Sequence, residues 1–259
     1  MTTYYIIMLG MAIMALIVFI ALFFFKAGYG YLSGSKWGPK ISNKTAWILM
    51  EAPAFLFMLY YTIDFATSGI DTGNSKLVLY IMAGLYLLHY FQRSFIFPLK
   101  MRGKSTMPIV IMLMGLTFNT LNAYIIGGWL FREAPEGMYG TGWLHSPQFI
   151  IGIIIFFTGM IINLHSDHVI RSLRKPGDTR HYIPRKGLYR YVTSANYFGE
   201  LTEWTGYAIL TWSPAGLLFA IWTFANLAPR AKALTAKYGQ EFGDEYTKLN
   251  KKHLIPFVW

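Results

Sequence analysis

Seven apolar segments, most of them long enough to cross a lipid bilayer as a helix, dominate this sequence. They cover residues 4–25, 45–66, 77–97, 107–130, 149–165, 197–212 and 214–227. A spanning helix needs about 20 such residues, and only 14% of the 259 residues are charged, against about 25% in soluble domains. These values exclude a disordered chain and argue against an ordinary soluble enzyme. The sequence predicts an all-α integral membrane protein with seven transmembrane helices in a single domain, residues 1–259.

The first segment and the last two segments can each be interpreted in two ways. Residues 4–25 form a charge-free stretch that is longer than the 7–15-residue apolar core of a signal peptide, so we expect a retained first helix. Ser213 and Pro214 separate the last two segments, which are short. Proline disfavours helical backbone in the residue before it, which predicts a tight helical hairpin. One long kinked helix is the alternative.

Lysine and arginine alternate from loop to loop. The first, third and fifth loops and the C-terminal tail carry 21 of the 23 lysines and arginines. Because cytoplasmic loops are enriched in these residues, the pattern predicts an N-terminus outside and a C-terminus in the cytoplasm. The expected location is a bacterial inner membrane or the endoplasmic reticulum. This topology accounts for the net charge of +11, so no nucleic-acid partner is expected. The absence of cysteine excludes disulfides and thiolate metal sites.

Ionisable groups inside the apolar segments are the first candidates for a functional site, because each costs about 2.5–3.5 kcal/mol to insert. Glu51 lies within the second segment, where a structural ion pair is the alternative role. In the third segment, His89, Tyr90 and Arg93 are spaced so that they share a helical face. Tyr90 is thus either an interfacial anchor or a hydrogen-bond donor to a substrate oxygen.

A second set of polar residues ends the fifth segment. Asn163, Asp167, Arg171 and Arg174 are spaced 4, 4 and 3 residues apart, which places them on one stripe of a helix. One interpretation is a helix that leaves the bilayer with Asp–Arg support. The other is a nucleotide site, in which arginines bind phosphates and the Asn and Asp side chains bind sugar or amide groups.

The sixth segment opens with a third set, in which Asn196, Glu200 and Glu203 share one face. Two buried carboxylates a turn apart repel each other unless they are paired. Pairing with the basic fifth loop is the structural alternative to a binding role. His165 and His168 have helical spacing but no further ligand cluster nearby, so no metal is expected.

Several long motifs, in order, resemble the steroid 5α-reductase family. They are AWILMEAP, HYFQRSFIFPL, NLHSDHVIRSLRKPGD, YIPRKGLYRYVTSANYFGELTEWTGYAILTWS and KKHLIPFVW, and the similarity runs from about residue 26 to the C-terminus. The resemblance implies a bacterial or other non-animal member with seven transmembrane helices and NADPH as cofactor. The implied reaction is reduction of the Δ4 double bond of a 3-oxo steroid, with hydride delivered to carbon 5.

The resemblance also implies roles for individual residues. Glu51 and Tyr90 match the pair that hydrogen-bonds the 3-keto oxygen, which makes them the expected catalytic residues. The expected cofactor-binding residues are Asn163, Asp167, Arg171, Arg174, Asn196, Glu200, Glu203, Arg230 and Tyr238. The expected partners are a small steroid or related enone from the lipid phase and membrane lipid, and the expected state is a monomer.

The chain departs from the family pattern at several positions. Met50 replaces the Gln of a Gln-Glu pair, Gln92 replaces a His, Leu234 replaces a His found in animal enzymes, and Lys186 precedes Gly187 where the family has two glycines. Alternatives therefore stay open: a reductase of another enone, a polyprenol or an enoyl thioester, or a methyltransferase of related fold. A proton-coupled transporter is the alternative from a different class.

Overall fold

The computed structural model describes residues 2–25, 30–32, 37–102, 105–175, 178 and 180–259. Its long helices are α1 (Thr3–Phe24), α2 (Asn43–Thr67), α3 (Lys76–Phe91), α5 (Ile109–Gly128), α6 (Pro147–Ser172), α7 (Ala195–Thr211) and α8 (Pro214–Phe242). The shorter elements are helices α4 (Phe97–Lys100) and α9 (Asp244–Thr247), π-helical turns Gln92–Ile96 and Trp129–Glu133, 3₁₀ turns Gly30–Leu32, Thr141–His145 and Gly187–Arg190, and strands β1 (Lys40–Ser42) and β2 (Thr106–Pro108). Lys26, Lys36 and Lys104 of the predicted basic loops lie outside the described residues.

Each predicted apolar segment forms a helix, which confirms the all-helical class. Among the residues that the structure describes, four helical stretches are long and apolar enough to cross a membrane: Thr3–Phe24, Asn43–Thr67, Ile109–Glu133 and Pro147–Ser172. These four stretches make the chain a membrane protein.

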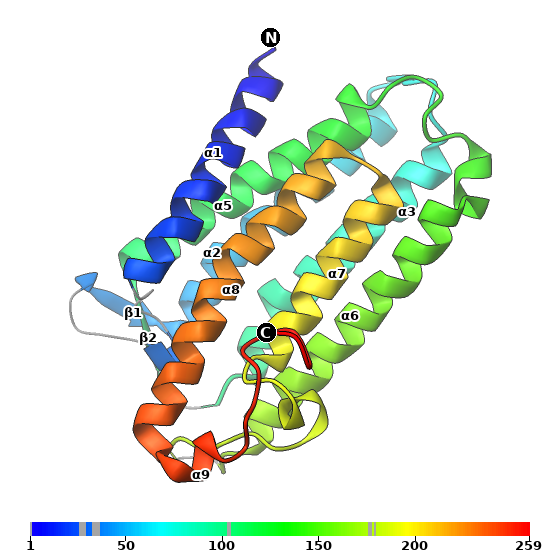
Figure 1. The fold of residues 1–259 in the computed structure, drawn as a ribbon. Helices are drawn as coiled ribbons and strands as arrows, with labels where there is room; N and C mark the ends of the chain where they lie inside the picture. The colour runs from blue at the N-terminus through cyan, green and yellow to red at the C-terminus, as the bar shows by residue number, and fades with distance from the viewer. Residues whose placement is uncertain (1, 26–29, 33–36, 103–104, 176–177, 179) are drawn as a thin grey trace.

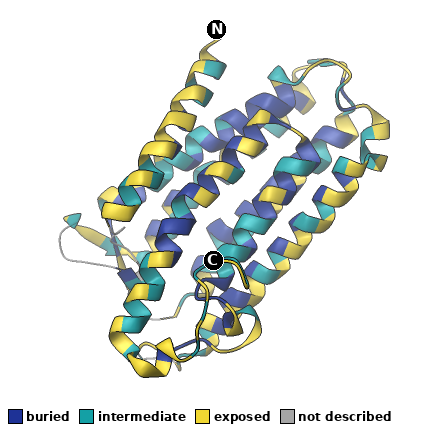
Figure 2. Cartoon of the chain, in the orientation of Figure 1, coloured by how far each residue is buried: buried dark blue, intermediate teal, exposed yellow. Residues whose placement is uncertain are grey.

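The outer surface of the bundle is apolar, the reverse of a soluble protein. On α1, Ile13, Leu16 and Ile20 are each more than half exposed, and Figure 2 shows exposed residues along most of this helix. Contiguous exposed apolar surface of this kind marks contact with a membrane. The opposite side of α1 is attached to the bundle, since the Trp222 indole N–H donates to the Met11 carbonyl at 2.8 Å.

Both strands and helix α9 lie at the same end of the bundle. This end is opposite to the N-terminus and the α7–α8 turn (Figure 1). The strands pair antiparallel, with Ile41 opposite Met107. Because β1 leads directly into α2 and β2 into α5, this pairing fixes where those two helices start relative to each other.

Helices α7 and α8 form a hairpin, as predicted, and the single kinked helix is wrong. Trp212 adopts a left-handed backbone with φ of 46°, which ends α7. The Ser213 hydroxyl accepts a hydrogen bond from the Gly216 amide at 2.9 Å. Pro214 occupies the first turn of α8, where its missing N–H costs nothing.

Helices α6 and α7 are in backbone contact along their length (Figure 1). A Cβ atom at Gly159 would collide with the backbone of Glu203, and one at Gly199 with the backbone of Asn163. Small residues permit this close approach between membrane helices. The two glycines thereby fix the relative positions of Asn163 and Glu203, both of them predicted site residues.

Several helix ends differ from the predicted boundaries. Helix α6 runs to Ser172 rather than 165, and α8 runs to Phe242 rather than 227 with Pro229 inside it. The apolar pattern marks only the part of a helix that suits lipid, and a helix continues beyond it wherever its polar side chains find partners. The third segment instead changes from α-helix to a π-helical turn after Phe91, a feature often found at functional sites.

Candidate functional site

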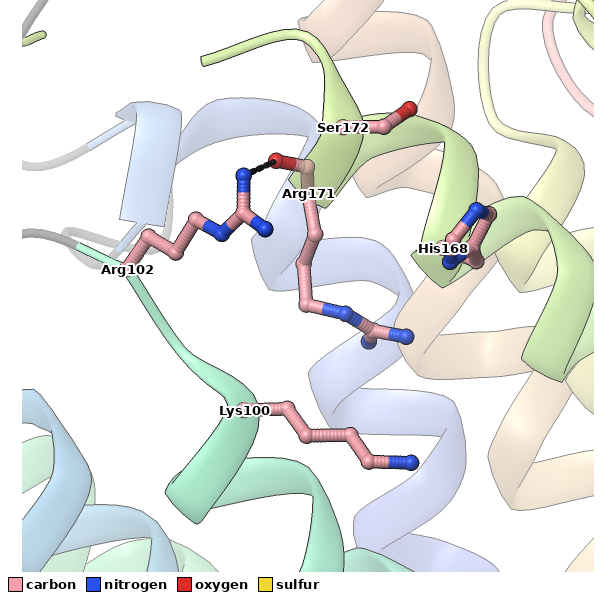
Figure 3. Close-up of a pocket in the computed structure, with 5 residues that line it drawn as sticks. All are labelled: Lys100, Arg102, His168, Arg171 and Ser172. Atoms are coloured by element: carbon pink, nitrogen blue, oxygen red, sulfur yellow. Dashed lines mark hydrogen bonds between the residues drawn. The ribbon is translucent and has the colours of Figure 1, made fainter. Parts of the chain in front are cut away.

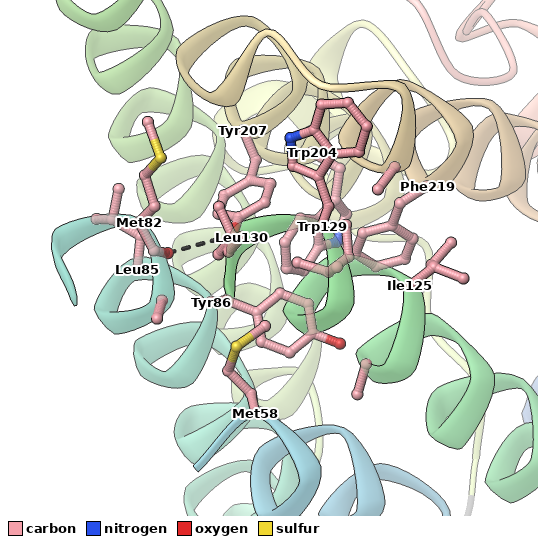
Figure 4. Close-up of a cluster of buried hydrophobic side chains, with 14 of the residues drawn as sticks. Met58, Met82, Leu85, Tyr86, Ile125, Trp129, Leu130, Trp204, Tyr207 and Phe219 are labelled. Atoms are coloured by element: carbon pink, nitrogen blue, oxygen red, sulfur yellow. Dashed lines mark hydrogen bonds between the residues drawn. The ribbon is translucent and has the colours of Figure 1, made fainter. Parts of the chain in front are cut away.

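An aromatic cluster packs against the candidate catalytic residue Tyr90. Tyr86, Trp204, Tyr207 and Phe219 are buried against one another (Figure 4). The Tyr90 ring lies on this cluster, with its centroid 4.6 Å from that of Tyr86 and 5.8 Å from that of Trp204. This packing fixes the Tyr90 side chain, which is only 3% exposed.

Glu51 and Tyr90 lie on different helices and meet through a third residue. Asn119 of α5 donates from Nδ2 to Glu51 Oε2 at 3.2 Å and accepts from the Tyr90 hydroxyl on Oδ1 at 3.2 Å. The same Nδ2 donates to the Met50 carbonyl at 2.8 Å. A carboxylate, an amide and a phenol thus form one hydrogen-bonded group among α2, α3 and α5, to which we refer as the Glu51–Asn119–Tyr90 group.

A second asparagine supports this group. Asn122 Nδ2 donates to the Tyr86 hydroxyl at 3.1 Å and to the Tyr90 hydroxyl at 3.4 Å. Neither Asn119 nor Asn122 is among the residues predicted for the site. The available signal was two amides three residues apart in an apolar segment, which places them on one helical face.

A buried His–Glu pair connects this group to α7. His89 Nδ1 lies 2.8 Å from Glu203 Oε1, with side-chain exposures of 6% and 1%. The His89 ring packs edge-on against the rings of Tyr90 and Trp204, with centroid distances of 5.1 Å and 4.5 Å. Glu203 therefore has its partner on α3, and the alternative that it pairs with the basic fifth loop is wrong for this residue.

Arg93 is the centre of a buried ionic cluster. Its Nη1 donates to Asp167 Oδ2 at 3.1 Å, and its Nη2 lies 3.7 Å from Glu200 Oε2. The guanidinium also lies over the rings of Trp47 and Phe97, at 4.9 Å and 4.5 Å from their centroids. Glu200, like Glu203, is thus paired with the third segment, so the carboxylates of α7 do not repel each other unpaired.

The predicted asparagines join α6 to α7 beside this cluster. Asn163 Nδ2 donates to the Asn196 carbonyl at 2.9 Å, and Asn196 Nδ2 donates to Asp167 Oδ1 at 3.3 Å. The Tyr189 hydroxyl donates to Asn196 Oδ1 at 3.2 Å. The sequence therefore predicted the common face of Asn163 and Asp167 on α6, and of Asn196, Glu200 and Glu203 on α7, correctly.

An open, basic pocket of about 330 Å3 lies at the outer end of the ionic cluster. Its lining residues are Lys100, Arg102, His168, Arg171 and Ser172, and Figure 3 shows the side chains of Lys100, Arg102 and His168 around that of Arg171. Within the described part of the chain, Arg171 Nη1 is buried and has no hydrogen-bond partner. A buried donor without a partner is costly, and a phosphate oxygen at this position would satisfy it.

Arg174 lies beyond the end of α6. The predicted stripe of four residues on one helix is therefore wrong for Arg174. Pro176 in the sequence explains the early end, since helical backbone is disfavoured before proline. Arg102 Nη1 donates to the Arg174 carbonyl at 2.9 Å, and Arg174 Nε donates to the Arg180 carbonyl at 2.7 Å. Arg174 therefore stays beside the basic pocket while its side chain is directed to the following loop.

The last two predicted residues lie on α8, where they pack against other segments. Arg230 Nε donates to the Tyr197 hydroxyl at 2.7 Å. The Tyr238 ring lies 4.9 Å from that of Tyr31. Arg230 thus contacts α7, and Tyr238 packs against the 3₁₀ turn Gly30–Leu32.

A set of contacts beyond the apolar part of α8 closes this end of the bundle. His181 Nδ1 lies 2.8 Å from Glu241 Oε1, and the Tyr31 hydroxyl donates to Glu241 Oε2. The Tyr31 hydrogen bond lowers the pKa of the Glu241 carboxyl below its ordinary value. In the tail, Lys251 Nζ donates to the Pro184 carbonyl at 2.6 Å, and burial lowers the pKa of Lys251 to about 8.

The chain is similar to a family of known proteins. Residues 105–259 match the family model described as 3-oxo-5-alpha-steroid 4-dehydrogenase. The chain is 41% identical to the human protein named 3-oxo-5-alpha-steroid 4-dehydrogenase 1 over 221 residues, 85% of this chain and 82% of the relative. It is 37% identical over 262 residues to the cotton (Gossypium hirsutum) protein named steroid 5-alpha-reductase DET2, covering 100% of this chain and 98% of the relative. The chain therefore belongs to the 3-oxo-5-alpha-steroid 4-dehydrogenase family, that of the steroid 5α-reductases.

Proposed function

We propose that this protein reduces the Δ4 double bond of a 3-oxo steroid with NADPH, in the membrane. The observation that carries the proposal is the convergence of Glu51 and Tyr90, from two different helices, on one buried amide. The buried pairs of His89 and Arg93 connect that group to a cation-rich pocket at the end of the bundle. An enone-binding end and a phosphate-binding end are what such a reduction requires of the protein.

The Tyr90 hydroxyl is the donor to the 3-keto oxygen in this mechanism. Addition of hydride to an enone places negative charge on the ketone oxygen, and a fixed hydroxyl donor stabilises that charge. Tyr90 is suited to this because the aromatic cluster holds its ring and excludes water. Glu51 acts on Tyr90 through Asn119 and so orients the hydroxyl.

The basic pocket and the residues above it are suited to the cofactor. Arg171, with its unpartnered buried nitrogen, would hold a phosphate together with Lys100 and Arg102. Asn163, Asp167 and Asn196 join α6 to α7 beside the Arg93 cluster and offer amide and carboxylate groups to a sugar or a carboxamide. NADPH, when bound, supplies the hydride, and the protein supplies its orientation.

The same proposal includes seven membrane spans with the N-terminus outside. The short elements at the end opposite to the N-terminus come from the basic loops of the sequence (Figure 1). An apolar steroid can then reach the aromatic cluster laterally from lipid, while the charged nucleotide reaches the basic pocket from the cytoplasm. The opposite polarities of the two ligands match the two ends of the site.

The direct test is NADPH oxidation by the purified protein in detergent. A panel of Δ4-3-oxo steroids should each be tested against the matching 3-hydroxy steroid, which lacks the ketone. We expect oxidation only with the 3-oxo compounds, and mass spectrometry should find a product heavier by two hydrogens. Methyl transfer from S-adenosylmethionine with no NADPH oxidation would contradict the proposal.

The cofactor site makes a prediction of its own. Arg171→Ala and Arg102→Ala should each weaken NADPH binding roughly tenfold to hundredfold, because both residues line the basic pocket and a charge-assisted hydrogen bond to phosphate contributes about 1.5–3 kcal/mol. Fluorescence titration with NADPH measures the Kd directly. Lys248→Ala, an exposed residue paired with Asp244, is the matched control and should leave the Kd unchanged. Wild-type affinity in both arginine variants would remove the nucleotide from this pocket.

The proposed topology is testable with single cysteines, since the chain has none of its own. Thr2→Cys, Lys175→Cys and Gln240→Cys all replace exposed residues. An impermeant thiol reagent applied from outside should label only position 2, and positions 175 and 240 should become reactive when the membrane is opened. Labelling of position 175 from outside would overturn the seven-span arrangement.

A further inference from the structure

The orientation of the Asn119 amide is determined by its neighbours. The Met50 carbonyl can only accept a hydrogen bond, so the Asn119 atom that lies 2.8 Å from it must be the NH2 group. The carbonyl oxygen of Asn119 therefore faces Tyr90, and the Tyr90 hydroxyl must be the donor at 3.2 Å. One amide thus sets the direction of the tyrosine proton and holds the glutamate carboxylate at its other end.

The surroundings of Asn119 show why this amide is needed. Met50, next to Glu51 on α2, has no side-chain N–H or O–H to offer to the carboxylate. Its side chain packs instead against α5 at Gly115, where a Cβ would meet the Met50 Cγ and sulfur atoms. Pro53 leaves α2 without one backbone hydrogen bond near Glu51. Asn119 supplies a donor at this weakened part of the helix.

We propose that Asn119 is a positioning residue for Tyr90 and Glu51 in the reduction of the enone. Asn119 is 4% exposed, so its amide is held by hydrogen bonds to protein groups rather than to water. When a ketone oxygen accepts a hydrogen bond from Tyr90, the hydroxyl turns from Asn119 to the substrate. Asn119 meanwhile keeps its hydrogen bond to Glu51 and holds that carboxylate in place. Asn119 acts through Tyr90 and touches no reacting atom. This inference rests on the proposed function of Tyr90.

A double-variant comparison separates positioning from packing. Asn119→Leu keeps the size and removes both ends of the amide, and kcat should fall about tenfold with the NADPH Kd within about twofold of wild type. In a Tyr90→Phe background the same change should lower the remaining single-turnover rate less than about twofold, because residues that act as a unit are not additive. Asn119→Gln restores an amide, so its kcat should be at least about threefold higher than that of Asn119→Leu. The control is Thr120→Val, since the Thr120 hydroxyl donates within its own helix, at 2.9 Å to the Leu116 carbonyl.

Each result has a defined meaning. The same loss from Asn119→Leu in both backgrounds would show that Asn119 only fills space, and would overturn the inference. Wild-type kcat in Asn119→Leu, with Tyr90→Phe impaired, would overturn it and leave the proposed function standing. Full activity in Tyr90→Phe alone would overturn the proposed function and this inference with it. If Asn119→Leu does not fold, as judged by NADPH binding, the smaller Asn119→Ser carries the same comparison.

Discussion

Tyr90→Phe is expected to lower kcat by about 10²–10³, the usual cost of removing one donor to a developing oxyanion. The change removes one hydroxyl from a ring held by Tyr86 and Trp204, so packing is retained and NADPH should bind with unchanged Kd. Single-turnover reduction of a Δ4-3-oxo steroid, followed by mass spectrometry, measures the rate of the chemical step. Full activity in a variant that binds NADPH would leave Tyr90 with a packing role alone, since its burial already argues against the alternative of an interfacial anchor.

Two further variants make this experiment specific. Tyr60→Phe is the matched control, because Tyr60 is 62% exposed on α2 and should tolerate the loss of its hydroxyl without effect. Glu51→Gln keeps the shape of the side chain and changes its charge. Since Glu51 and Tyr90 meet at Asn119, the double variant should be little worse than the poorer single one. Additive losses would mean that the two residues act independently.

Arg93→Met is expected to destabilise the fold by about 3–5 kcal/mol, the cost of leaving a buried charge without its partner. Arg93 and Asp167 have side-chain exposures of 9% and 5%, so little water reaches the carboxylate that would be left behind. Glu200, at 3.7 Å, would lose the same partner. In detergent the melting temperature should fall by about 6–20 °C for a chain of this size.

The matched control for this change is Arg185→Met. Its pair with Glu245 has the same kind of contact, 2.8 Å, but side-chain exposures of 51% and 64%, and an exposed pair contributes about 0–1 kcal/mol. Asp167→Asn added to Arg93→Met should restore part of the lost stability, because it removes one of the two unpaired carboxylates. Equal melting temperatures for Arg93→Met and Arg185→Met would show that the buried cluster does not contribute to stability.

The fold class followed from the apolar segments. Bilayer thickness sets the length of a spanning helix, so the helical regions, their order and the α7–α8 hairpin at Pro214 were all encoded locally. The ends of α6 and α8 were not, because they extend into regions where polar partners rather than lipid decide the helix length. The pairing of β1 with β2 joins segments far apart in the sequence, and no local sequence pattern predicts it.

The helix faces that carry the candidate site were likewise visible in the sequence, because residues three and four apart on a helix share one side. Asn163 with Asp167, and Asn196 with Glu200 and Glu203, could be grouped on that ground alone. Which residue pairs with which could not. Glu203 pairs with His89, and Glu200 pairs with Arg93. These pairs form because glycines at positions 159 and 199 bring α6 and α7 into contact beside α3.

The centre of the site was decided only by tertiary structure. Glu51, Tyr90 and Asn119 come from three helices, and side chains on different helices have no fixed spacing in the sequence. Asn119 resembles any other amide in an apolar segment until α2 and α5 pack and bring Met50 and Glu51 within hydrogen-bonding distance. Local periodicity determines which face of a helix is polar, whereas the packing of that helix against its neighbours determines what the polar face meets.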